Sequence, residues 1–264
     1  ISRRQRQMCI RDRTNVFGVK KECFVASPVD QFKLKTLVPF EVGGVDLAYT
    51  TSSLWMTITV VAVTLFLTLS MRGGRLVPGR WQSLAELSYE FIANMIRENV
   101  GTEGRKYFPF IFTLFMFILM GNLLGMIPYS YTFTSQIVVT FAIAITIFLG
   151  VTVIGIVLHG FHFFTLFVPP GMPIVLAPLL IPIEVISYFV RPVSLSVRLF
   201  ANMMAGHTMM KVFAGFTAAL GVLGIAPILL LVALTGFEIM VAVLQAYVFT
   251  VLTCLYLNDA IHLH

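Results

Sequence analysis

The sequence predicts an all-α polytopic membrane protein with about five membrane helices and one amphipathic helix at the membrane interface. Of its 264 residues, 58% are hydrophobic and only 11% are charged, and the mean hydropathy is +0.91. Soluble domains are ~25% charged on average. Six charged residues lie beyond position 106: Glu184, Arg191, Arg198, Lys211, Glu238 and Asp259. So few charges over residues 107–264 exclude a cytosolic or secreted globular fold.

The chain divides into a basic leader (1–25), an N-terminal segment (26–53) and a single membrane domain (54–264). The leader is arginine-rich, starts with Ile and lacks the apolar core of a signal peptide, so we expect an extension that is foreign to the fold. The net charge of +6 arises within the first 35 residues, so we expect no nucleic-acid partner. Three cysteines without metal or redox spacing predict neither a metal ion nor a cofactor.

The first two predicted elements are a membrane helix and an amphipathic helix. Leu54–Met71 is uncharged and long enough for a hydrocarbon core of ~30 Å. At ~100° per residue, one face of Trp81–Val100 carries four apolar side chains: Leu84, Leu87, Phe91 and Met95. Because membrane spans flank it, we expect this helix to lie in the interface; the alternative is a helix packed on a soluble partner.

Two ordinary membrane helices follow, at Tyr107–Ile127 and Ile137–Leu158. The loop between the first and second spans holds six basic residues near span ends: Arg72, Arg75, Arg80, Arg97, Arg105 and Lys106. The positive-inside rule therefore places this loop in the cytoplasm, or in the matrix of a mitochondrion.

The last hundred residues form two apolar stretches that are too long for ordinary spans. As single helices at ~1.5 Å per residue, Ile174–Phe216 would reach ~64 Å and Pro227–His264 ~57 Å, about twice the hydrocarbon thickness. Each stretch either breaks into two short spans or is one long, strongly tilted helix. Pro178, Pro182 and Pro192 allow kinks in the first stretch, and the sequence pattern leaves both readings open.

Charged side chains within these stretches are the candidate functional residues, because a charge in the bilayer is disfavoured by ~2.5–3.5 kcal/mol. Arg198 stays protonated at any working pH, so it cannot carry a proton but can hold a permanent charge opposite a carboxylate. Four polar residues project within about 40° of Arg198 on an ideal helix: Glu184, Ser187, Ser194 and Asn202. They predict a water-accessible track. Glu184 is equally well placed, however, to be a structural partner of Arg191.

A second group of polar residues points to proton transfer. His207 lies on the opposite face from Arg198, and Glu238 is an isolated acid in the final stretch, with Gln245 on the same face. A neutral His–Glu pair in a low-dielectric setting can pass protons near physiological pH. His159 and His162 border a loop and are candidates for proton access.

The segments PIEVISYFVRPVSLSVRLFANMMAGH and FEIMVAVLQAYVFTVLTCLYL resemble the a-subunit family of F-type (rotary) ATP synthases. The resemblance covers residues 26–264 and includes RWQSLAELSYEFIANMI in the amphipathic helix. It implies that the last two stretches are long tilted helices forming a hairpin along a ring of c subunits. It further implies a stator subunit that conducts protons and is not an enzyme on its own.

The resemblance also assigns roles to individual residues. It makes Arg198 the family's essential arginine and implies proton translocation by five others: His207, Glu238, Asn202, Gln245 and Glu184. In some members the His and Glu of the proton-path pair are exchanged, which indicates that the two act as a unit.

The partners that the resemblance implies are the c-subunit ring, the peripheral-stalk b subunits, other ATP synthase subunits, the lipid bilayer and protons. The implied location is the bacterial inner membrane, with the mitochondrial inner membrane as the alternative. A stand-alone secondary transporter or ion channel is the competing function. The sequence disfavours it, because no internal repeat is evident.

Overall fold

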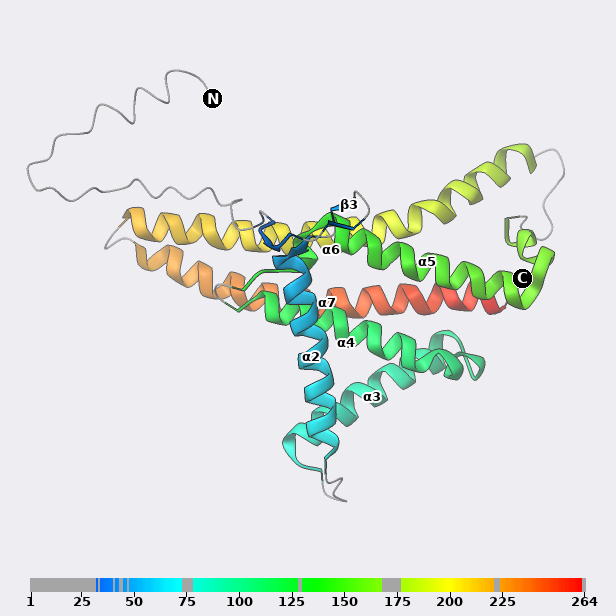
Figure 1. Cartoon of the computed structure of the whole chain (residues 1–264), viewed down its shortest axis with the longest axis horizontal. Helices are drawn as coiled ribbons and strands as arrows, with labels where there is room; N and C mark the ends of the chain where they lie inside the picture. Colours follow the sequence, from blue (N-terminus) through cyan, green and yellow to red (C-terminus); the bar gives the residue numbers. More distant parts are fainter. Residues whose placement is uncertain are drawn as a thin grey trace, which may run out of the picture.

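The computed structural model describes residues 32, 34–39, 41–42, 45–46, 48–72, 78–127, 130–167, 177–220 and 224–262. The expected basic leader at 1–25 lies outside them. Within the described residues, five helices are long and apolar enough to cross a membrane. The predicted α-helical membrane fold is therefore confirmed (Figure 1).

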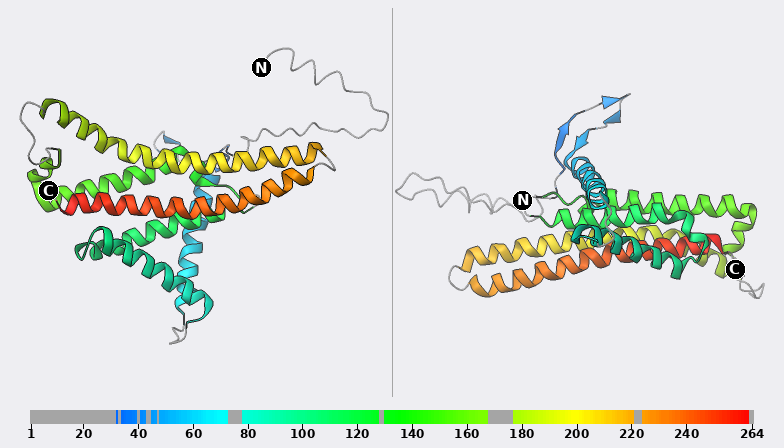
Figure 2. Two further views of the ribbon diagram at one scale, coloured as in Figure 1. Left: turned by 180° about the vertical axis from the view of Figure 1, so that it is seen from behind. Right: turned by 90° about the horizontal axis from the view of Figure 1, so that it is seen from below.

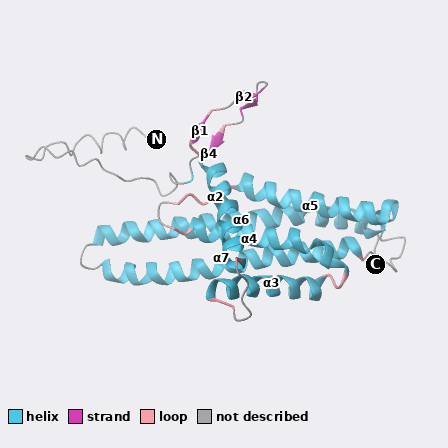
Figure 3. Cartoon of the chain, turned by 60° about the horizontal axis from the view of Figure 1, so that its bottom comes forward, coloured by secondary structure: helices cyan, strands magenta, loops and turns pink. Residues whose placement is uncertain are grey.

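A small β-structure precedes the first membrane helix and was not predicted. Strand β1 (Thr36–Val38) pairs antiparallel with β4 (Tyr49–Thr50), and β2 (Glu41–Val42) pairs with β3 (Val45–Asp46). Figure 3 shows these strands projecting from the N-terminal end of α2 (Thr51–Met71). Thr50 caps α2, because its Oγ1 accepts a hydrogen bond from the backbone N–H of Ser53 at 3.4 Å.

Helix α3 (Arg80–Asn99) is the predicted amphipathic helix, and this chain covers only part of its apolar surface. Met95 is buried together with Ile92 and Ile96, which belong to the main core. In contrast, Leu84, Leu87 and Phe91 are 49%, 65% and 43% exposed. A membrane interface or a soluble partner would cover these exposed apolar side chains.

The central helices end close to where the sequence places them. After the 3-10 turn η2 (Glu103–Tyr107), α4 spans Phe108–Gly125. The turn η3 (Phe133–Ser135) leads into α5 (Ile137–His159), which stops at Gly160, whose φ of +57° is readily adopted by glycine. Another 3-10 segment, η4 (Gly160–Phe167), follows α5.

The two long C-terminal stretches are continuous helices. Helix α6 spans Ala177–Leu220 and α7 spans Ile225–Ile261, which correspond to ~66 Å and ~56 Å. Both run crosswise to α2, and their halves nearest the connecting loop lie side by side (Figures 1 and 2). The reading in which each stretch breaks into two short spans is therefore wrong. Pro182 and Pro192 lie inside α6, so the helix tolerates the loss of two backbone hydrogen bonds.

The hydrophobic core lies where α4 meets α3, α5 and the long hairpin. Its fully buried side chains come from α3 (Ile92), α4 (Ile111 and Ile118), α6 (Leu199) and α7 (Phe249). This packing fixes the rotation of α6 and α7. It thereby decides which of their polar residues face the interior and which face outward.

Candidate functional site

The polar residues of α6 are divided between an outward side and the interface with α7. Arg198, Ser187 and Ser194 are exposed, and Glu184 and Asn202 are half-buried. Among the described residues, no carboxylate lies within ion-pair distance of the Arg198 guanidinium. The hairpin therefore presents a permanent positive charge on its surface, next to a row of polar side chains.

Asn202 connects this outward row to the interior. Its Nδ2 donates a hydrogen bond to Oε1 of Gln245 on α7, with a separation of 3.1 Å. Gln245 is 3% exposed, and its Nε2 has no partner among the described residues. The contact links the turn of α6 that follows Arg198 to α7.

His207 and Glu238 meet in the interface between α6 and α7. His207 Nε2 lies 3.8 Å from Glu238 Oε1, and the two side chains are 11% and 5% exposed. Neither carboxylate oxygen of Glu238 has a hydrogen-bond partner among the described residues. A buried polar group without a partner is energetically disfavoured, which marks this carboxyl group as a candidate site for binding a proton or water.

Gly206 is the reason that the carboxyl group fits against α6. A Cβ added to Gly206 would lie 2.5 Å from Glu238 Oε1 and 2.8 Å from its Cδ. The absence of a side chain at this position therefore creates the space in which Glu238 approaches His207.

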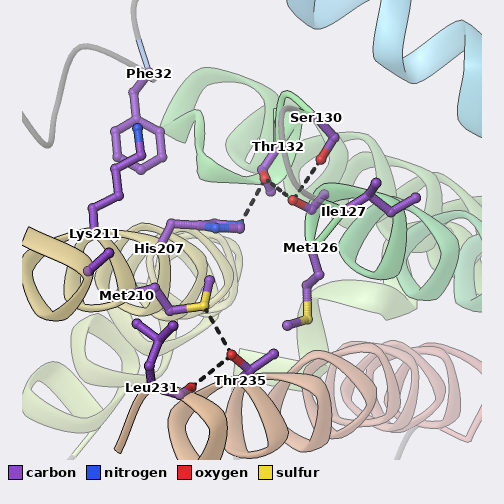
Figure 4. A pocket seen from close by; sticks show the side chains of 12 residues that line it. Phe32, Met126, Ile127, Ser130, Thr132, His207, Met210, Lys211, Leu231 and Thr235 are labelled. Atoms are coloured by element: carbon purple, nitrogen blue, oxygen red, sulfur yellow. Dashed lines mark hydrogen bonds between the residues drawn. The ribbon is translucent and has the colours of Figure 1, made fainter. Parts of the chain in front are cut away.

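A cavity of about 350 Å³ opens beside His207 (Figure 4). Its wall combines the end of α4, the turn before η3, and the halves of α6 and α7 nearest their loop. Its lining residues include Phe32, Gly125, Thr132, His207 and Lys211. The cavity lies at the end of α4 that is opposite the predicted basic loop.

Tyr131 and Gln136 hold the N-terminal segment at this cavity. Gln136 Nε2 donates to Phe32 O at 2.8 Å and to Tyr131 Oη at 2.6 Å. Burial raises the pKa of Tyr131, so its hydroxyl remains protonated and donates to Phe32 O at 3.4 Å. The segment that contains Phe32 thus contributes to the cavity wall.

The other candidates from the sequence lie elsewhere. The ring nitrogen Nε2 of His159 lies 3.0 Å from Ile261 O, which ties the end of α5 to the end of α7. His162 is exposed in η4. Neither histidine lines the cavity beside His207, so the structure does not bring them together with it.

Arg191 pairs with Asp259, which corrects one of the two readings of Glu184. Arg191 Nη1 lies 2.9 Å from Asp259 Oδ2, and the guanidinium also lies over the rings of Tyr188 and Tyr256. Glu184 is therefore not the structural partner of Arg191. The sequence contained one indication of the Arg191–Asp259 pair, because Asp259 is one of the two acidic residues in the final stretch.

Sequence comparison decides the family. The family described as ATP synthase A chain matches residues 53–258, which is more than half of the chain. The chain belongs to this family. That membership confirms the resemblance noted from the RLFANMMAGH segment and its surroundings.

Three relatives illustrate how close the family match is, and all bear the name ATP synthase subunit a. The protein from Paramagnetospirillum magneticum is 57% identical over 247 residues, covering 91% of this chain and 100% of the relative. The Rhodospirillum rubrum protein is 58% identical, and the match covers 90% of this chain and 99% of the relative. The Rhizobium etli protein is 55% identical, and the match covers 89% of this chain and 97% of the relative. These organisms are bacteria. This member of the ATP synthase A chain family is thus a multi-pass membrane protein.

Proposed function

We propose that this chain is the proton-conducting stator wall of an ATP synthase membrane sector, with two half-channels facing a rotating ring of c subunits. One contrast within the hairpin carries the proposal. Arg198 is exposed on α6, whereas His207 and Glu238 lie together in the interior, where His207 lines a cavity. The family membership supports the same role.

Arg198 separates the two half-channels in this proposal. A rotor carboxylate must be neutral to face lipid, because a bare charge in hydrocarbon is strongly disfavoured. The permanent charge of Arg198 attracts the carboxylate once it is deprotonated. The same charge repels protons, so it prevents a direct leak from one half-channel to the other.

His207 and Glu238 deliver protons to the ring. Protons enter the cavity from the periplasmic or intermembrane side and pass through the pair to a rotor carboxylate. The loaded site turns through lipid and releases its proton into the second half-channel, on the side of Glu184. A potential of ~100 mV contributes about 2.3 kcal/mol per proton moved across the membrane.

The partners follow from this mechanism. We propose the c ring against the exposed side of α6, the peripheral-stalk b subunits, and the bacterial inner membrane as location, because the relatives are bacterial. Asn202 and Gln245 keep the two helices in register beside Arg198. Among the described residues, no observation favours a stand-alone transporter.

The deciding experiment measures ATP-driven proton pumping by the complete complex in vesicles. Arg198→Ala is expected to abolish pumping while the complex still assembles. Arg97→Ala is the matched control, because Arg97 is also an exposed arginine but lies on α3. Pumping that survives in Arg198→Ala would refute the proposal, and ion flux through the chain without a c ring would favour a transporter instead.

A further inference from the structure

We propose that Thr132 is a positioning residue that fixes which ring nitrogen of His207 carries the proton. The inference deepens the proposed function and rests on the role assigned there to His207. It concerns a residue in the turn between α4 and η3, to which no role in proton transfer has been assigned above. The inference rests on the single proton that one hydroxyl group has to donate.

The Thr132 hydroxyl contacts two groups at once (Figure 4). Its Oγ1 lies 3.0 Å from Gly125 O and 2.9 Å from His207 Nε2. A carbonyl oxygen only accepts hydrogen bonds, and a hydroxyl has a single proton to donate. Gly125 O also accepts a hydrogen bond from Ser130 Oγ at 2.8 Å, and we assign the Thr132 proton to this carbonyl as well. On this assignment Thr132 accepts from His207, so Nε2 carries a proton.

This assignment determines the neutral tautomer of His207. A neutral imidazole has one N–H, so a proton on Nε2 leaves Nδ1 as the ring's free proton acceptor. The Nε2 proton lies next to both Thr132 and Glu238, whose Oε1 is 3.8 Å away. Protons therefore arrive at one nitrogen and leave from the other.

The proton balance over one cycle is simple. A proton taken up at Nδ1 converts the ring into imidazolium. The Nε2 proton then moves to the Glu238 carboxylate once the 3.8 Å separation shortens to the ~2.8 Å of a charge-assisted hydrogen bond. The ring is left neutral, with its proton on Nδ1. Uptake of a second proton at Nε2, followed by release of the Nδ1 proton to cavity water, restores the tautomer that Thr132 favours, so each cycle moves one proton to Glu238.

The position of Thr132 is set by its surroundings. A Cβ on Gly125 would lie 2.7 Å from Thr132 Oγ1, so the close approach requires a glycine there. The neighbouring Phe133 is 1% exposed and packs against Phe117 with ring centroids 5.4 Å apart. Thr132 itself is 5% exposed. The hydroxyl is thus held in place and is not free to follow the ring.

Charged groups reach His207 from two of the elements around it. Glu238 approaches from α7, and Lys211 lies one turn further along α6 and lines the same cavity. The described part of the segment between α4 and α5 contributes no charged residue, so its contribution at the ring is the neutral Thr132 hydroxyl. Removing this hydroxyl changes the hydrogen bonding of His207 without changing the charge around it.

The test compares three variants in the assembled complex. Thr132→Val removes the hydroxyl at similar shape, and Thr132→Ser retains it. Thr140→Val is the matched control, because Thr140 is equally buried but bonds only to the backbone of its own region. We expect proton pumping about tenfold slower in Thr132→Val, as for a lost hydrogen bond to a functional group. Thr132→Ser and Thr140→Val should remain within about twofold of the unchanged protein.

A spectroscopic readout separates positioning from a merely structural role. In complex labelled with ¹⁵N-histidine, the His207 signal is identified by its loss in His207→Gln. The unchanged protein should show the tautomer protonated at Nε2, and Thr132→Val should show a mixture of both tautomers. An unchanged tautomer in Thr132→Val, or a proton on Nδ1 in the unchanged protein, overturns the inference.

The two proposals fail in different ways. If His207→Ala pumps normally, the proposed role of His207 is wrong. If His207→Ala is inactive but Thr132→Val pumps normally, only the role of Thr132 is wrong. If the Thr132→Val complex fails to assemble, Thr132→Ala is used in its place. The tautomer mixture and slower pumping are expected in Thr132→Ala as well, and an unchanged tautomer in that variant counts against the inference.

Discussion

Arg191 of α6 and Asp259 of α7 are 68 positions apart in the sequence and form an ion pair with 2.9 Å between Nη1 and Oδ2. The contact joins the halves of the two long helices that lie away from their connecting loop. The Arg191 guanidinium also lies 5.1 Å from the centre of the Tyr256 ring. The pair therefore sets how α6 and α7 are aligned at the end opposite the cavity.

The first prediction concerns this alignment. Charge reversal of either partner (Arg191→Asp or Asp259→Arg) places like charges together, so we expect less subunit in the assembled complex. The double exchange restores opposite charges and should recover assembly. The side chains are 30% and 40% exposed, so the coupling between the two sites should be modest, about 1 kcal/mol. Quantifying the subunit in purified complex checks this, and a double exchange no better than the single variants contradicts it.

The second prediction tests the space next to Glu238. Gly206→Ala pushes the carboxyl group away from His207, because the new Cβ would lie 2.5 Å from Oε1. We expect proton pumping to fall by roughly tenfold to a hundredfold, as for a displaced functional group. Since alanine favours helix more than glycine, a loss of helix stability would not explain the defect. Gly215→Ala in α6 is the control, because nothing lies within 4 Å of its Cβ position. Equal pumping in the two variants would refute the steric argument.

The third prediction tests whether His207 and Glu238 act as a unit. The exchange variant, with His207→Glu and Glu238→His together, keeps both groups in the same space. It should retain more proton pumping than His207→Ala or Glu238→Ala alone. Pumping by vesicles with matched amounts of complex is the measurement. If the exchange is no more active than the single alanine variants, independent roles for the two residues are favoured.

The fourth prediction concerns the contact beside Arg198. Gln245→Leu removes the acceptor of the 3.1 Å hydrogen bond from Asn202 and leaves the half-buried Asn202 amide without its partner. We expect pumping to fall by about fivefold, equivalent to the ~1 kcal/mol of a typical hydrogen bond. The double variant Asn202→Leu/Gln245→Leu should be little worse than either single variant. Fully additive losses would show that the two side chains are not coupled.

The fifth prediction locates the rotor. In a background without the native cysteines, Val193→Cys and Val197→Cys should form disulfides with cysteines on the outer helix of a c subunit. Both positions are about 45% exposed on α6 near Arg198. Val157→Cys on α5 is exposed but lies on another element, and it should not cross-link. Cross-links from Val157→Cys in place of the α6 positions would move the proposed ring to another face.

The local elements were predictable because they depend on composition and length. Leu54–Met71, Tyr107–Ile127 and Ile137–Leu158 each match a membrane helix of the structure, with ends shifted by no more than three residues. The short strands before α2 were missed, because strands of two or three residues leave no periodic signal. The unbroken course of α6 was also undecided, since prolines are compatible with both a kink and a break.

The candidate site was predictable only as a set of residue types. Charges in an apolar stretch are rare enough to mark Arg198, His207 and Glu238 without a structure. The partners of these residues were not predictable. The contact between His207 and Thr132 spans 75 positions, and that between Arg191 and Asp259 spans 68. Both depend on how neighbouring helices are rotated, which a single helix cannot specify.

The sequence by itself determined that this protein lies in a membrane, where its first three membrane helices lie and which residues carry charge into the bilayer. These properties follow from the free energy of transferring each segment from water, which is a sum over local residues. The tertiary structure alone decided that Arg198 faces outward and that Glu238 fits against Gly206. It likewise decided that the Thr132 hydroxyl meets His207. Such contacts arise from packing between helices, where the shape of one side chain limits the position of another.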